Sequence, residues 1–306
     1  MYQRIRTWSW SLLLLSAGAS AQERCVSLVT SAGGQSFWSQ VRQSAEQAAD
    51  ELDIPLYARG PSRDGDSRVQ LELIERMLKF ECKVLIVAPN GPEVGRRMAE
   101  LKKLGVLGLY VDRDLGGNAV QAAIATDNRA AGRHAGTELA RLLGGQGRVA
   151  VLRLDERVQS TSERERGFIE GARAGGLQVV LDRYLPLSDP RAMAELGEQL
   201  KRLDGLFTPS EGTTLEVLAA LRRLKLAGRL AHIGFDSSPL LIDALQRDEI
   251  AGLMVQQPRL LGSESVARAR RLLDGDLSGP RQVNLPARYV DSRNLDDEEV
   301  QRLLAP

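Results

Sequence analysis

The chain has 306 residues, of which 43% are hydrophobic and 26% are charged, and its formal net charge is +1 at pH 7. This length suits one or two domains with a sizeable core, and the composition is that of an ordinary globular protein. A net charge so close to zero excludes a general electrostatic affinity for nucleic acid or for anionic membranes.

The N-terminal residues predict a secretory signal peptide. The basic stretch MYQRIR precedes the apolar stretch TWSWSLLLLSA, and Ala19-Ser20-Ala21 fits the small-x-small cleavage rule. We therefore expect a signal peptide over residues 1–21 and a mature chain that starts at Gln22. A buried N-terminal helix is the alternative, but it fits poorly with arginines followed by leucines. No lipobox precedes Cys25, and no later segment reaches about 18 uninterrupted apolar residues, so we expect a soluble mature chain without a lipid anchor.

Short β-rich runs alternate with segments of 3.6-residue apolar periodicity along the rest of the chain. The expected strands are Cys25–Thr30, Ile54–Ala58, Lys83–Ala88, Val106–Val111, Val120–Thr126, Arg148–Leu154, Leu177–Leu181, Gly205–Thr208, Leu230–Phe235 and Gly252–Gln256. The expected helices are Phe37–Leu52, Leu71–Phe80, Arg129–Leu143, Glu163–Ala174, Ala192–Leu203, Thr213–Leu226 and Leu260–Leu273. This alternation predicts an α/β fold of parallel sheets covered by helices on both faces. Because the strands are too many for one compact sheet, we expect two Rossmann-like lobes that meet near Thr126-Asp127-Asn128.

The two cysteines, Cys25 and Cys82, each open an apolar run that is predicted to be a strand. If these strands are parallel neighbours, both sulfur atoms lie at the same edge of the sheet, where an oxidising compartment would allow a disulfide. Two buried free thiols are the alternative. With only these cysteines and two histidines, His134 and His232, no metal-ligand spacing appears, and we expect no metal ion and no cofactor.

Polar and aromatic residues follow many of the expected strands. In open α/β sheets, ligands bind beyond the carboxyl ends of the strands, so these residues are candidates for a single crevice. The segments are Ser31–Trp38, Asp112–Asp114, Ser160–Arg164, Pro209–Glu211, Asp236–Ser238 and Gln256–Pro258. Carboxylates accept hydrogen bonds from neutral hydroxyls and guanidinium groups donate to them, while an aromatic face suits the C–H face of a sugar.

Each segment alone also has a plain structural explanation. Charges after a strand are commonly a solvated turn, and Asp236 could cap the next helix. Phe37 and Trp38 would commonly be core residues, and Arg164 a surface residue on an amphipathic helix. Their joint placement at successive strand ends is what favours a binding site.

In this order and spacing the chain resembles the periplasmic sugar-binding proteins of the ribose-binding type, the solute receptors of ABC importers. The matching segments span nearly all of the mature chain and are QSFW, VDRD, IATDN, STSERERGF, FTPSEGTTLEVLAAL, HIGFDSSP and GLMVQQP. The DNA-binding regulators of the LacI type share this core, but the chain shows no N-terminal helix-turn-helix. The resemblance implies a type I periplasmic binding fold with hinges at Ala125-Thr126-Asp127, at Gln256-Gln257 and near Leu285. It places the N-terminal lobe at 22–125 plus 257–288 and the C-terminal lobe at 126–256 plus 289–306.

The resemblance also implies a set of ligand contacts. The aromatic pair would pack against the sugar ring, and the charged and amide side chains would hydrogen-bond its hydroxyls. These residues are Gln35, Phe37, Trp38, Asp112, Arg113, Arg164, Ser210, Asp236 and Gln256. Two positions depart from the ribose pattern, since Gln35 replaces a common Asn and Ser210-Glu211 replaces Asn-Asp. The shorter serine offers no two-pronged amide, so we expect a wider or water-filled pocket, and the identity of the sugar stays open.

The expected function is capture of a small sugar or polyol between two lobes, and its presentation by a monomer to the permease of an ABC importer. A periplasmic sensory subunit for a chemoreceptor or sensor kinase is the alternative with the same fold. An enzyme is disfavoured because no GxSxG, P-loop or metal motif appears, although Asp112 and Asp236 could form the carboxylate pair of a glycosidase. The tail Ser292–Pro306 is expected to hold a solvated terminal helix.

Overall fold

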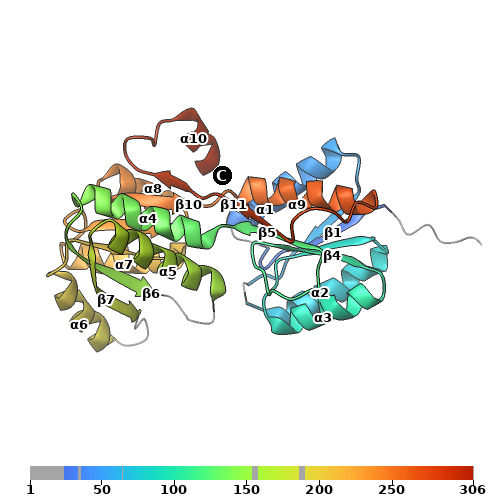
Figure 1. Ribbon diagram of the computed structural model, residues 1–306, viewed down its shortest axis with the longest axis horizontal. Helices are drawn as coiled ribbons and strands as arrows, with labels where there is room; N and C mark the ends of the chain where they lie inside the picture. The colour runs from blue at the N-terminus through green and yellow to red at the C-terminus, as the bar shows by residue number, and fades with distance from the viewer. Residues whose placement is uncertain (1–23, 34–35, 64, 154–157, 186–189, 306) are drawn as a thin grey trace, which may run out of the picture.

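The computed structural model of the protein describes residues 24–33, 36–63, 65–153, 158–185 and 190–305. They form two α/β lobes that lie side by side, each with one six-stranded sheet and helices on both of its faces (Figure 1). The expected signal peptide, residues 1–21, lies outside the described residues.

The first lobe contains a parallel sheet with the strand order β11-β5-β4-β3-β1-β2. Its strands are β1 Val26–Val29, β2 Leu56–Arg59, β3 Val84–Val87, β4 Leu107–Val111, β5 Ala122–Thr126 and β11 Gln282–Leu285. Its helices are α1 Ser36–Glu51, α2 Ser67–Met77, the short 3-10 helix η1 Leu78–Phe80, α3 Pro92–Lys103 and α9 Pro258–Leu273. Helix α9 comes late in the chain but packs beside α1, so this lobe is built from two separate parts of the sequence.

The second lobe repeats this plan with the strand order β12-β10-β9-β8-β6-β7. Its strands are β6 Arg148–Arg153, β7 Gln178–Tyr184, β8 Gly205–Phe207, β9 Ala231–Phe235, β10 Gly252–Val255 and β12 Arg288–Val290. Its helices are α4 Asn128–Leu142, α5 Gln159–Ala174, α6 Pro190–Leu200, α7 Glu211–Arg223, α8 Pro239–Gln246 and α10 Glu298–Leu304. Among the strands that the structure describes in this lobe, only β12 runs antiparallel to its neighbour, β10.

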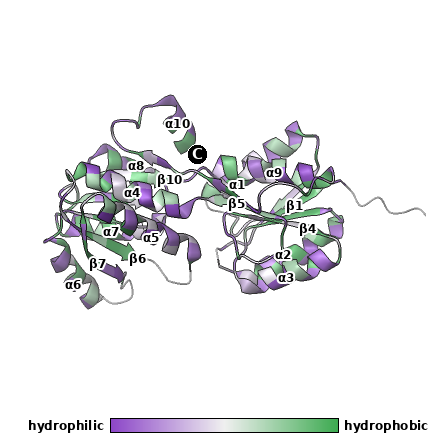
Figure 2. Cartoon of the chain, in the orientation of Figure 1, coloured by the Kyte–Doolittle hydropathy of each residue, from purple (hydrophilic) through white to green (hydrophobic). Residues whose placement is uncertain are grey.

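The central strands are apolar throughout because both faces of each sheet are covered. In β3, Val84 and Ile86 join the core on the α1 and α9 side, whereas Leu85 and Val87 join the core on the opposite side. Side chains alternate between the faces of a strand, so a continuous apolar run is what a sheet covered on both sides requires. Figure 2 shows this as hydrophobic strands inside each lobe and more hydrophilic outer helices.

The α/β fold with two Rossmann-like lobes is confirmed, and every strand expected from the sequence is present. The sequence analysis missed the short strands β11 and β12 and the helices α3 and α8. Helix α3 carried a readable signal, since Pro92 stands at its first position and Val94, Met98 and Leu101 form its buried stripe. The expectation of a solvated terminal helix is wrong for one face of α10, because Val300 is completely buried in the second lobe.

The chain passes between the two sheets after β5, after β10 and after β11. The crossing segments are hydrogen-bonded to one another. The Asp127 N–H donates to the Leu285 carbonyl at 2.8 Å, and Gln257 Nε2 donates to the Pro286 carbonyl at 2.8 Å. The exact residues at which each lobe begins and ends stay a prediction.

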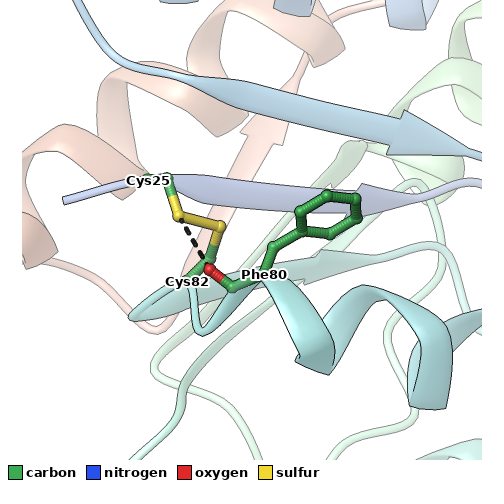
Figure 3. The surroundings of a disulfide bond; sticks show 3 residues. All are labelled: Cys25, Phe80 and Cys82. Atoms are coloured by element: carbon green, nitrogen blue, oxygen red, sulfur yellow. Dashed lines mark hydrogen bonds between the residues drawn. A yellow bond between two sulfur atoms is a disulfide. The ribbon is translucent and has the colours of Figure 1, made fainter. Parts of the chain in front are cut away.

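A disulfide joins Cys25, just before β1, to Cys82, just before β3 (Figure 3). The two strands are parallel neighbours, which brings the two Cα atoms to 4.8 Å. Sγ of Cys25 lies 3.8 Å from the carbonyl oxygen of Phe80, whose ring stacks on Tyr57 at 4.0 Å between centroids. The pairing that the sequence left open is therefore formed, at the amino-terminal edge of the first sheet.

Candidate ligand-binding site

Two aspartates occupy equivalent places at the carboxyl ends of β4 and β9. Asp112 and Asp236 both adopt left-handed backbone conformations, with φ angles of 64° and 66°. The Asp112 N–H donates a hydrogen bond to the Ile124 carbonyl at 2.8 Å, and the Asp236 N–H donates one to the Met254 carbonyl at 2.7 Å. Each bond extends the hydrogen bonding between neighbouring strands by one residue. Non-glycine residues rarely adopt this conformation, and such residues cluster at functional sites. The repeated geometry points to the strand ends as the site in both lobes.

In the first lobe, Arg113 lies between two polar partners. Its Nε is 3.7 Å from Asp112 Oδ2, and its Nη1 donates to Asn90 Oδ1 at 3.1 Å. Asn90 is itself held in place, because its Nδ2 donates to the Ser31 carbonyl at 2.9 Å and its N–H donates to Gln70 Oε1 at 2.8 Å. Asn90 was not predicted as a site residue, although it comes three residues after the end of β3, at the same edge of the sheet as Asp112.

The third charge of the VDRD segment has a structural role. Asp114 accepts hydrogen bonds from Arg281 Nη2 at 2.9 Å and from Gln282 Nε2 at 3.1 Å, at the start of β11. Burial alone would raise the pKa of Asp114, but these hydrogen bonds and that from the Gly116 N–H outweigh it and lower the pKa. Asp114 therefore links the end of β4 to the start of β11, the strand that precedes the last crossing between the lobes.

In the second lobe, Arg164 is buried to 4% exposure near the start of α5. Its Nε donates to Asn128 Oδ1 at 2.7 Å, and its Nη1 donates to the Pro209 carbonyl at 2.9 Å. The guanidinium carbon lies 3.7 Å from the centre of the Phe235 ring, a cation–π contact. Nη1 is also 3.9 Å from Asp236 Oδ2. The expectation of a surface arginine does not hold, because this cation is buried among polar partners.

Gln256 connects the second-lobe site to the hinge. Its Nε2 donates to Asp236 Oδ1 at 2.7 Å, and its Oε1 accepts from Thr126 Oγ1 at 2.8 Å. Thr126 ends β5 in the first sheet and Gln256 follows β10 in the second, so this buried amide bridges two crossing segments. A side chain that orients Asp236 is thus tied to the place where the lobes join.

Charged groups at the strand ends of both lobes affect the pKa of Arg164. Burial lowers the pKa of the Arg164 guanidinium, while the charges of Asp236 and Asp112 raise it and that of Arg113 lowers it. Charges from both lobes therefore act on one buried group. The four residues comprise two acids and two bases, and such a balanced set suits a neutral ligand with many hydroxyls better than an ion.

The aromatic pair at the start of α1 is divided between two environments. Trp38 is 3% exposed and belongs to the core of the first lobe, whereas Phe37 is partly exposed. The rings meet edge to face with their centroids 5.0 Å apart. Of the two rings, Phe37 therefore has exposed surface that a ligand could contact, and the buried Trp38 packs against it. Gln35 lies outside the described residues.

Ser210 is used by the fold at the start of α7. It is the N-cap residue, and with Thr213 it forms a capping box in which its Oγ lies 3.0 Å from Thr213 Oγ1. Behind it runs a buried network in which Thr208 Oγ1 lies 2.8 Å from both Thr214 Oγ1 and His232 Nε2. Burial lowers the pKa of His232 to about 3, so this histidine is neutral inside the protein at ordinary pH.

Among the described residues, no group of three or more His, Cys, Asp or Glu side chains is placed to hold a metal ion. In the same part of the chain, no helix has both the length and the apolar character needed to cross a membrane.

Comparison with known proteins decides the family. The model of the periplasmic binding protein domain matches residues 26–277. The chain belongs to the periplasmic binding protein family. The ribose import binding protein of Haemophilus influenzae is 27% identical to it over 270 residues, which cover 86% of this chain and 90% of that protein.

Solved structures agree with this assignment. The periplasmic component of an ABC-type sugar transport system from Hahella chejuensis is 32% identical, with a TM-score of 0.75 over 87% of this chain and all of that one. A carbohydrate transporter solute-binding protein from Agrobacterium radiobacter, in complex with D-arabinose, has a TM-score of 0.79 over 93% of this chain and 100% of its own. At 22% identity the latter shows a shared fold alone. The resemblance to ribose-type receptors and the type I fold are confirmed, and members of this family are solute receptors of the periplasm.

Proposed function

We propose that this periplasmic binding protein captures a small sugar or sugar-like polyol between its lobes and delivers it to the permease of an ABC importer. The observation that carries the proposal is that an acid and a base lie together at the strand ends of each lobe, Asp112 with Arg113 in the first and Asp236 with Arg164 in the second. The relatives support the sugar class, since one is named for ribose import and another was solved with D-arabinose. Their import role favours delivery to a transporter over the sensory alternative.

The proposed ligand contacts follow from the geometry of each side chain. Asp112 and Asp236 accept hydrogen bonds from ring hydroxyls, and Arg113 and Arg164 donate to them. Gln256 contributes by holding Asp236 in place. Ser210 contributes through the cap of α7, and its hydroxyl, which also contacts Thr213, is proposed to reach the sugar through water.

Phe37 supplies the apolar face of the proposed pocket, backed by the buried Trp38. Gln35, which comes just before α1 in the sequence, is proposed as a further ligand contact. The signal peptide of residues 1–21 is proposed to be removed on export. The mature receptor is proposed to act as a monomer.

The proposed mechanism is hinge closure. A sugar that touches both halves of the site binds the closed arrangement more tightly than the open one, so it shifts the population toward closure. Closure brings the charged groups into a site with little water, where their hydrogen bonds to the sugar strengthen. The permease then recognises the closed pair of lobes. No chemical step is required of Asp112 or Asp236, and the sugar leaves unchanged.

A thermal-shift screen against pentoses, hexoses and polyols tests the proposal. A sugar at one hundred times its dissociation constant stabilises the folded state by about 2.7 kcal/mol, which gives a rise in Tm of several degrees. Chromatography of the incubated sugar should recover it intact. A flat screen across all three classes contradicts the proposal, and conversion of a sugar would reassign the protein to catalysis.

A further inference from the structure

Helices α4 and α5 approach each other at backbone distance through glycines on both sides. A Cβ atom added to Gly132 of α4 would lie 1.9 Å from the Arg164 carbonyl oxygen, and one added to Gly167 of α5 would lie 2.1 Å from the Arg129 carbonyl oxygen. Real Cβ atoms essentially never come within 3.0 Å of another heavy atom, so only glycine allows this crossing. The backbone of Arg164 thus rests directly on α4, and the position of α4 fixes where its side chain starts.

Asn128 is the first residue of α4 and lies one helical turn before Gly132, on the same face. Its Oδ1 accepts the hydrogen bond from Arg164 Nε at 2.7 Å. The Pro209 carbonyl and the Phe235 ring hold the same guanidinium from two further elements. These contacts fix both the position and the plane of the Arg164 head group.

Asn128 is not needed to cap the helix that it begins. The cap is Asp127, whose carboxylate accepts the Ala130 N–H at 2.9 Å. Within the described residues, the hydrogen bonds of the Arg164 guanidinium come from Nε and Nη1. The arrangement thus immobilises the Nε and Nη1 side of the guanidinium and leaves Nη2 for a ligand.

We propose that Asn128 is a positioning residue that holds Arg164 in its sugar-binding orientation before the sugar arrives. This inference rests on the proposed function and assigns a role within the same site. A long arginine side chain that is already fixed loses little rotamer freedom when the sugar binds, whereas a mobile one loses much. Removal of the Asn128 acceptor should therefore weaken sugar binding about three- to tenfold, and it should act through Arg164 alone.

Titration calorimetry with D-ribose and D-arabinose on five proteins tests this inference. The proteins are the wild type, Asn128→Ala, Asn128→Asp, Arg164→Ala and the double variant Asn128→Ala/Arg164→Ala. Asn128→Ala should bind about three- to tenfold more weakly, and Asn128→Asp, which keeps an acceptor oxygen, should bind within about twofold of the wild type. The double variant should bind no more weakly than Arg164→Ala alone, because the removed acceptor then has no guanidinium to hold.

Arg129→Ala is the matched control at the next position. Arg129 also joins α4 to α5, through Glu163 at 3.0 Å and through Glu170, but none of these contacts involves the Arg164 guanidinium. Its loss should leave the sugar affinity within about twofold, because these partly exposed ion pairs do not touch the guanidinium of Arg164. An equal loss of affinity in Arg129→Ala would show that loosening of the helix pair is the cause, and would overturn the positioning role.

A measurement without sugar separates this inference from the proposed function. In the ligand-free wild type, nuclear magnetic resonance should show slow hydrogen exchange at the Arg164 Nε–H, and Asn128→Ala should speed it by at least about tenfold while Tm changes little. Unchanged exchange together with unchanged affinity in Asn128→Ala overturns the positioning role and leaves the receptor function standing. Retained affinity in Arg164→Ala, or no sugar binding by the wild type, contradicts the proposed site and the inference with it.

Discussion

The disulfide should stabilise the first lobe without affecting ligand binding. Cys25 and Cys82 are 57 residues apart in sequence, and the loop that they close contains β1, α1, β2, α2 and η1. For a loop of this length the chain-entropy relation gives about 4 kcal/mol of stabilisation at 25 °C. The bond lies at the amino-terminal edge of the sheet, whereas Asp112 and Arg113 follow the carboxyl end of β4. Its loss should therefore reduce the free energy of unfolding and leave the sugar affinity unchanged.

Trp38 provides a local probe for this experiment. It is buried in the core of the first lobe, and the only other tryptophans of the chain, Trp8 and Trp10, lie in the predicted signal peptide. In protein expressed without residues 1–21, Trp38 fluorescence follows the unfolding of the first lobe in urea. The Cys25→Ser/Cys82→Ser variant should lose about 4 kcal/mol, and a reductant should cause the same loss in the wild type.

The variant provides its own control, because a reductant should change nothing once both sulfurs are gone. Equal unfolding free energies for oxidised wild type and variant would refute the entropic reasoning. A loss of sugar affinity in the variant would refute the separation of the disulfide from the site.

Three further predictions concern single side chains. Arg113→Ala should weaken sugar binding by about 2 kcal/mol, roughly thirtyfold in Kd by calorimetry, with a nearly unchanged Tm in the absence of sugar. Unaltered affinity in that variant would remove Arg113 from the site. His232 has a pKa of about 3 in the folded protein and about 6.5 when unfolded, so its contribution to stability is complete above pH 6.5 and is lost as the pH falls toward 3. Urea titrations should show about 2 kcal/mol of this loss between pH 6.5 and 4.5 in the wild type beyond that in His232→Gln. Identical profiles would contradict a buried neutral histidine. Val300→Ala should destabilise the second lobe by about 2 kcal/mol, whereas Arg302→Ala on the exposed face of α10 should cost less than about 0.5 kcal/mol; equal effects would mean that α10 does not pack through Val300.

The VDRD segment shows how far a local pattern can predict a site. The apolar run followed by charges correctly marked the end of β4, since a charged group cannot continue a strand that is buried on both faces. It could not separate the roles of Asp112 and Asp114. The partner of Asp114 is Arg281, which is 167 residues further along the chain and adjoins a strand that returns only after the second lobe is complete. Such a pairing depends on tertiary structure that no local pattern contains.

The aromatic and serine positions mark two other limits. Trp38 is buried in the core and Phe37 is only partly buried against it, and the order of two adjacent aromatic residues did not predict which would be more exposed. The capping role of Ser210 was readable from the Ser-x-x-Thr spacing to Thr213, whereas the resemblance to ribose-type receptors assigned the same position to the ligand. Strand β11 escaped detection because only one of its four residues is fully buried, which leaves a weak apolar signal.

A crystal structure of the sugar complex tests the central claim most directly. The account predicts one sugar between the lobes, with oxygen atoms of Asp112 and Asp236 and nitrogen atoms of Arg113 and Arg164 within about 3 Å of its hydroxyls. A sugar held by side chains of one lobe alone, or bound away from the ends of β4 and β9, would contradict it.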